Sequence, residues 1–354
     1  LPISFQVWVV SHFMQQPDFT NLEAASAPDL TKADATALSG MQSAADTDTQ
    51  KTENATLPIP ETDNIPERIH ASNAPERVFA SMKRLCEKAP RIHCLTNAVT
   101  MNDIANILLA IGGSAIMAQA KEEAAQITAL CEATLLNTGT PSDNKFISQL
   151  LAGEEANRLC HPLVLDPVGV GASTYRRENI KKLLTHIRPN LIRCNLEEAV
   201  TLLSIVSAKA QLEDAAAAIP APFCKICHGG VESGVEADVT VRAETAKKLA
   251  SAFRTTVLVS GSTDAVSDGV HTALITGGDS RITRITGSGC MLSAICAALL
   301  SVSESPYEAA LDASILWKQA AECAGQKTDL ESAGMGSFHR FLFDAATNLG
   351  CLKI

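Results

Sequence analysis

The feature that most constrains this chain is a glycine–serine–glycine stretch that runs directly into a long uncharged segment. Gly287, Ser288 and Gly289 are followed by Cys290, and no charged residue appears before Leu300. Glycine allows a sharp turn and close approach of a ligand to the backbone, and an apolar run of this length is typical of a buried helix. The first N–H groups of a helix lack internal acceptors and lie at the positive end of its dipole. The stretch therefore predicts an anion site, for phosphate above all, with a glycine turn capping a core helix as the structural alternative.

Short aliphatic strands alternate with helical segments from about residue 76 onwards. Strands are expected at residues 92–96, 114–117, 134–137, 162–165, 191–193 and 256–259, and two hairpin-like pieces follow at 265–269 and 271–276. Hydrophobic residues make up 46% and aromatic residues only 4%, which suits aliphatic strands covered by helices. The alternation predicts right-handed crossovers. The expected fold class is α/β, with a mostly parallel central sheet flanked by helices on both faces.

Residues 1–75 differ in composition from the rest of the chain. Residues 1–67 contain two basic and ten acidic residues, and no sustained apolar period appears between residues 15 and 66. Such a segment cannot bury enough apolar surface to offset the entropy lost on ordering. The sequence therefore predicts a disordered acidic extension at 1–75, of which residues 1 to about 72 are dispensable for folding, and a folded domain at 76–354.

Charge and cysteine content exclude several classes of protein. A net charge of -10 argues against nucleic acid as the main partner, and no apolar run is long enough to span a membrane. The 11 cysteines show no disulfide-like pattern, which indicates reduced thiols and a cytoplasmic location. Residues 224–228 spell a haem-attachment signature, but no export signal or second zinc-ligand pair accompanies it, so neither haem nor zinc is expected.

Polar residues and glycines gather where the expected strands end. In open α/β sheets ligands bind at this edge, which here carries Asn97, Gly139, Asp166, Asn195 and Gly261. Asp166 follows an apolar strand and suits Mg²⁺ in phosphoryl transfer, with a turn cap as the alternative. Glu197 and Glu198 open the next helix, where carboxylates also stabilise a helix N-terminus. Acids at two neighbouring strand ends beside an anion loop favour a metal–phosphate site.

Arginines near this edge have different expected roles. Arg193 lies within an aliphatic strand, so it must pair with an acid or reach phosphate oxygens. Arg176 and Arg177 are expected to be solvated. The chain has no Gly-x-x-x-x-Gly-Lys-Ser/Thr loop, which excludes a Walker-type kinase.

Together, these residues resemble the hydroxyethylthiazole kinases, thiamine-biosynthesis enzymes of the ribokinase-like fold. The resemblance covers residues of about 77 to 350, and its motifs occur in the order of the family at 93–97, 115–118, 136–140, 165–172, 192–198, 285–290 and 334–338. Most ribokinase-like kinases have Asp as the base after the glycine loop, whereas the thiazole kinases have Cys, as Cys290 does here. The resemblance implies ATP- and Mg²⁺-dependent phosphorylation of 4-methyl-5-(2-hydroxyethyl)thiazole, in a homotrimer with sites between subunits.

The resemblance also implies roles for particular residues. Its catalytic group comprises Cys290 with the loop residues Gly287, Ser288 and Gly289. The other implied roles are thiazole binding by Asn97, Met117 and Gly287, ATP binding by Arg193, Asn195 and Ser260, and metal binding by Asp166 and Glu198.

Three residues depart from the pattern of the family, and two other functions stay open. Cys194 stands in place of Gly, Ser260 in place of Thr, and Met335 in place of Pro. The departures affect the nucleotide contacts more than the thiazole contacts.

One alternative function is that of a related kinase acting on another heterocyclic alcohol, such as the hydroxymethylpyrimidine of thiamine. The other is a binding protein that keeps the pocket without turnover.

Overall fold

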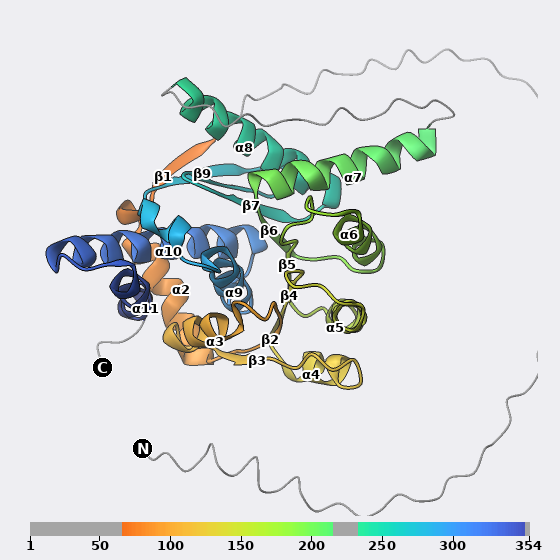
Figure 1. The fold of residues 1–354 in the computed structure, drawn as a ribbon, viewed down its shortest axis with the longest axis horizontal. Coiled ribbons are helices and arrows are strands. Elements are labelled where there is room, and N and C mark those ends of the chain that lie inside the picture. The colour runs from red at the N-terminus through yellow and green to blue at the C-terminus, as the bar shows by residue number, and fades with distance from the viewer. Residues whose placement is uncertain (1–65, 215–232, 351–354) are drawn as a thin grey trace, which may run out of the picture. The chain divides into compact units, whose positions relative to one another are not determined.

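The structure is a computed structural model, and it describes residues 66–214 and 233–350. Within these residues the chain forms a nine-stranded sheet with helices on both faces (Figure 1). The α/β architecture expected from the alternating strands and helices is thereby confirmed.

The sheet is almost entirely parallel. Its strand order is β1-β9-β8-β7-β6-β5-β4-β2-β3, and β8 alone runs antiparallel to its neighbours. The two expected hairpin pieces are β8 and β9. The strands are β1 (Glu67–His70), β2 (Arg91–Leu95), β3 (Ser114–Ile116), β4 (Ala133–Asn137), β5 (Leu163–Asp166), β6 (Leu191–Asn195), β7 (Thr256–Ser260), β8 (Asp264–Ser267) and β9 (Thr272–Thr276).

Two apolar cores lie on the two faces of the sheet, each under its own set of helices. One core receives buried residues from α2 (Pro75–Lys88), α3 (Met101–Ala110), α9 (Ser288–Leu300), α10 (Pro306–Leu330) and α11 (Met335–Gly350). The other receives them from α4 (Ala124–Leu130), α5 (Asp143–Arg158), α6 (Thr174–His186), α7 (Leu196–Asp214) and α8 (Ser233–Phe253). Figure 1 shows α4, α5 and α6 stacked on one side, opposite α2, α10 and α11.

Helix α9 is the central element of the first core. Every residue from Cys290 to Leu300 is buried, and the helix packs against α3, α10 and the strands β4 and β5. A helix that is uncharged all round is stable only where it is covered on all sides. The expectation of a buried helix after the glycine loop is therefore confirmed.

The folded domain begins earlier than the expected boundary at residue 76. Strand β1 pairs in parallel with β9, and Ala71 is fully buried in the first core. The sequence pattern did not indicate β1, because it is an edge strand with mostly exposed side chains, held by backbone hydrogen bonds rather than by an apolar pattern. Residues 1–65, where disorder was expected, lie outside the described residues.

The described cysteines mostly meet the expectation of reduced thiols. Seven are free, among them Cys194, Cys290 and Cys296. Cys86 is disulfide-bonded, which contradicts the expectation at that position. The haem-like stretch at 224–228 lies outside the described residues. In the described part of the chain, no helix is long and apolar enough to cross a membrane.

Candidate active site

The loop before α9 requires glycine at two positions. Gly287 is the N-cap residue with φ 80°, and a Cβ there would lie 2.3 Å from Thr100 Cγ2. A Cβ on Gly289 would lie 2.4 Å from a guanidinium nitrogen of Arg193. The first position needs a left-handed backbone, and the second lets an arginine lie directly over the start of the helix. The sequence pattern thus produces a helix N-terminus with a cation close to its first turn.

The thiol of Cys290 is held by two amide side chains. The Nδ2 atom of Asn137 lies 3.2 Å from the sulfur, and that of Asn97 lies 3.4 Å from it. Burial raises the pKa of the Cys290 thiol above its ordinary value, and the carboxyl of Asp166 raises it further. The thiol is therefore mostly protonated at neutral pH, which makes it a weak proton acceptor in this structure.

Asp166 is fully buried beside Cys290 at the end of β5. Its Oδ2 accepts hydrogen bonds from Asn137 Nδ2 at 2.7 Å and from Ser293 Oγ at 2.8 Å. Its Oδ1 has no hydrogen-bond partner, although Arg193 Nη1 lies 3.8 Å away. Burial raises the pKa of Asp166 to about 6, against the lowering effect of Arg193. One carboxylate oxygen is thus left available at the strand edge.

Arg193 links the acid to the neighbouring strand. The guanidinium lies within ion-pair distance of Asp166 and donates a hydrogen bond to Ser260 Oγ at the end of β7. Of the two alternatives expected for Arg193, an acid partner or phosphate oxygens, the structure shows the acid partner. Ser260 keeps the hydroxyl that threonine has in the family, and Cys194 is buried in the second core, on strand β6. These two departures therefore leave the polar groups at this edge in place.

Glu198 and Asn195 cap the start of α7. Asn195 Oδ1 accepts from the Glu198 backbone N–H at 2.8 Å, and Glu198 Oε2 accepts from the Asn195 N–H at 2.9 Å. The other oxygen of Glu198 accepts from the Gly169 N–H at 2.8 Å. This reciprocal pairing is a capping box. It is the structural role that the sequence allowed for a carboxylate in the first turn of this helix. Asn195 is itself exposed at the end of β6.

The other expected residues lie in less direct positions. Met117 is half-buried just after β3 and packs against the first core. Met335 begins α11, and it packs against the same core. Arg176 is half-buried and donates to the carbonyls of Thr138 and Val168, so the expectation that it is solvated was wrong. In the described residues, no group of three or more His, Cys, Asp or Glu side chains is arranged to hold a metal ion.

Two residues of the site were missed in the sequence. Asn137 bridges Asp166 and Cys290, and Ser293 donates to Asp166 from one turn further along α9. Asn137 carried a usable signal, because it ends an aliphatic strand as Asp166 does. Ser293 carried only a weak one, because small polar residues are common inside buried helices.

The arrangement is of the ribokinase-like type: a mostly parallel sheet, a glycine loop at the start of a buried helix, and an acid and an arginine beside it. A ribokinase-like superfamily protein from Enterococcus faecalis has the same fold, with a TM-score of 0.50 at 10% identity over 80% of this chain and 96% of that one.

The family follows from closer relatives. The sequence model of the hydroxyethylthiazole kinase family matches residues 82–350. The hydroxyethylthiazole kinase of Lysinibacillus sphaericus is 39% identical over 72% of this chain and 93% of its own length. That of Listeria monocytogenes is 38% identical over 75% of this chain and 91% of its own length. The solved hydroxyethylthiazole kinase structure from Pyrococcus horikoshii has a TM-score of 0.63 at 30% identity, over 77% and 93% of the two chains. This chain belongs to the hydroxyethylthiazole kinase family.

Proposed function

We propose that this protein transfers the γ-phosphoryl group of ATP to the hydroxyl of 4-methyl-5-(2-hydroxyethyl)thiazole, in thiamine biosynthesis or salvage. The observation that carries the proposal is the position of Cys290, in the first turn of α9, where two amides hold its thiol beside Asp166. Family membership over residues 82–350 supports the same reaction.

The start of α9 suits the charge that develops during transfer. As the alcohol oxygen attacks the γ-phosphorus, its proton passes to the thiolate form of Cys290 and the bond to ADP breaks, while negative charge spreads over the phosphoryl oxygens. The backbone N–H groups of Gly289 and Cys290 lie at the positive end of the helix dipole, whereas that of Ser288 already donates to the Ile285 carbonyl at 3.3 Å. Arg193 lies against Gly289. Donors fixed in this way stabilise the transition state without reorganising, which is a large part of catalysis by such sites.

The remaining contacts are proposed from the family. Asn97, Met117 and Gly287 would hold the thiazole, and Asn97 is already within hydrogen-bond reach of Cys290. Arg193, Asn195 and Ser260 would contact ATP, and they lie together at the ends of β6 and β7. With these contacts, the alcohol acceptor would lie near β2 and the nucleotide near β6 and β7, with the start of α9 between them.

Asp166 fits Mg²⁺ better than Glu198 does. Mg²⁺ is held in phosphoryl-transfer sites through one or two carboxylates together with substrate phosphates. The Asp166 Oδ1 atom is buried without a hydrogen-bond partner, as expected for an oxygen that takes a metal or a metal-bound water. Both Glu198 oxygens accept backbone N–H groups, although a carboxylate retains further lone pairs for a metal-bound water. Bound Mg²⁺ would neutralise phosphate charge, and Asp166 would hold it while Glu198 orients the loop at Gly169.

We further propose a homotrimer and a cytoplasmic location. The trimer rests on the family resemblance. The location is supported by the predominance of free thiols, since disulfides are rare in the cytosol. Seven of the eight cysteines in the described residues are free, and Cys86 is disulfide-bonded. Sedimentation or light scattering tests the trimer directly.

ATP consumption with the thiazole alcohol and Mg²⁺ tests the proposed reaction. The expected result is ADP formation that requires both the alcohol and the metal. The matched reaction contains hydroxymethylpyrimidine in place of the thiazole. Preference for the pyrimidine would assign the other heterocycle, and thiazole binding without ADP formation would identify a non-catalytic homologue.

A further inference from the structure

Lys145 is a buried cation that the reaction described above does not use. It lies on α5 with 6% of its surface exposed, and its Nζ donates to the Gly139 carbonyl at 2.5 Å. Among the ion pairs of the described residues, none neutralises it. A buried ammonium without a carboxylate partner carries a large desolvation penalty. Its presence next to the site therefore calls for a role beyond packing.

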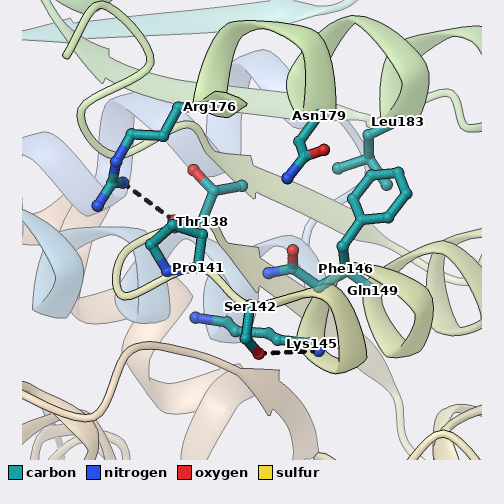
Figure 2. A pocket seen from close by; sticks show the side chains of 9 residues that line it. All are labelled: Thr138, Pro141, Ser142, Lys145, Phe146, Gln149, Arg176, Asn179 and Leu183. Carbon is teal, nitrogen blue, oxygen red and sulfur yellow. Dashed lines mark hydrogen bonds between the residues drawn. The ribbon is translucent and has the colours of Figure 1, made fainter. Parts of the chain in front are cut away.

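Lys145 and Arg176 hold consecutive carbonyls of one turn. Arg176 reaches from α6 and donates to Thr138 O at 3.2 Å, and Lys145 reaches from α5 to Gly139 O. Figure 2 shows the two side chains approaching from opposite sides of Thr138, at the edge of a crevice that both of them line. The turn that follows β4 is thus fixed from two helices by charge-assisted hydrogen bonds.

This turn sets the two amides that hold the Cys290 thiol. The Gly139 N–H donates to Asn137 Oδ1 at 3.0 Å, which orients the amide so that its Nδ2 faces the sulfur. Gly139 also lies against Asn97, because a Cβ on Gly139 would be 2.8 Å from Asn97 Cβ. Thr140 Oγ1 accepts from the Ala98 N–H at 3.1 Å and ties the turn to the chain beside Asn97. A displacement of the Gly139 carbonyl would therefore move both amides.

We infer that Lys145 is a positioning residue of the acceptor side of the site, which acts through the Gly139 turn on Asn97 and Asn137. The inference rests on the proposed kinase function. It predicts an effect on the alcohol and on turnover, and little effect on ATP, because the nucleotide residues lie at the ends of β6 and β7.

The electrostatic surroundings give this role a pH dependence. Burial lowers the pKa of Lys145 to about 8; the nearby Cys290 and Asp166 oppose that shift, and Arg176 adds to it. The ammonium is therefore mostly protonated at neutral pH and is lost as the pH rises through about 8. If positioning of the Gly139 turn needs the Lys145 ammonium, turnover of the alcohol should decline as the pH rises through about 8.

The test compares Lys145→Met with Lys181→Met, a control on exposed α6 surface. Both variants should fold with melting temperatures near that of the unmodified protein. The expected result for Lys145→Met is a loss of about tenfold or more in kcat/KM for the thiazole alcohol, with the KM for ATP within about twofold. The Lys181→Met variant should behave as the unmodified protein. The alkaline decline near pH 8 should be weaker in Lys145→Met.

Several outcomes overturn the inference. One is a folded Lys145→Met with kcat/KM for the alcohol within threefold of the unmodified protein; another is equal loss for alcohol and ATP. If Lys145→Met does not fold, Lys145→Gln is tested instead, because its side chain keeps an uncharged donor for the Gly139 carbonyl. If that variant has the activity and the pH profile of the unmodified protein, the site does not need the ammonium group and the inference is wrong. An unmodified protein that makes no ADP refutes the proposed function instead, and calorimetric binding of the alcohol to both variants then still tests Lys145.

Discussion

Cys290→Asp is the substitution that tests the site most directly. The thiol lies in the first turn of α9, with two amide donors facing it and Arg193 close by. A carboxylate at this position would accept the same two hydrogen bonds, and Asp is favoured near a helix N-terminus. We expect the variant to fold and to keep or raise turnover of the thiazole alcohol.

The magnitude follows from the two protonation states. An ordinary cysteine is only a few per cent thiolate at pH 7, and burial raises the pKa of Cys290 further. A carboxyl at position 290 would be roughly 90% ionised even with the pKa of about 6 that complete burial gives Asp166. Compared with an ordinary cysteine, the population of ionised base thus rises by roughly 30-fold, while a carboxylate that is a weaker base than an ordinary thiolate by about 2.5 pKa units loses roughly 20-fold at a Brønsted slope of about 0.5. Burial lowers the thiolate population of Cys290 below that of an ordinary cysteine, which shifts the balance toward a gain for the carboxylate. The two effects nearly cancel, so kcat should lie between unchanged and about tenfold higher, a gain of at most about 1.4 kcal/mol.

Steady-state kinetics and a melting curve on the one variant decide the outcome. Cys296→Asp provides the contrast, because it places the same carboxyl in the fully buried interior of the same helix. That control should lose several kcal/mol of stability, since a charge there is buried in an apolar core. If Cys290→Asp is as unstable as Cys296→Asp and turns over at least tenfold more slowly, Cys290 only packs under the loop and the reasoning fails.

Three further predictions concern the acid and the start of the domain. Asp166→Asn should lose at least about a hundredfold in Mg²⁺-dependent kcat while calorimetry shows the thiazole alcohol still bound; near-normal turnover would make Asp166 a structural residue only. In EDTA, the raised pKa of Asp166 means that the folded state holds the proton more tightly than the unfolded state does. The free energy of unfolding should therefore fall by about 3 kcal/mol as the pH rises from about 4 to about 6. Melting curves of Asp166→Asn should lack this decline. Deletion of residues 1–65 should leave the melting temperature unchanged. Deletion of residues 1–72 also removes β1 and the buried Ala71, so it should lower the melting temperature by several degrees. Equal melting temperatures for the two deletions would show that β1 adds no stability.

The sequence by itself determined the elements and the chemistry carried by local patterns. The aliphatic strands, the uncharged run after Gly289 and the polar residues at strand ends depend on neighbours in the chain, so their periodicity and turn residues predict them. For the same reason the motifs from residue 93 to residue 338 indicated the family before any contact was visible.

The tertiary structure alone decided which of these groups meet. Asn137 of β4 contacts Cys290, and Ser293 of α9 contacts Asp166. Lys145 of α5 contacts Gly139. Local periodicity in the sequence does not relate the members of these pairs. The same holds for β1, whose place in the sheet depends on backbone pairing with β9 about 200 residues away. Burial likewise appears only after folding, and it is burial that raises the pKa of Asp166 and keeps Cys290 protonated.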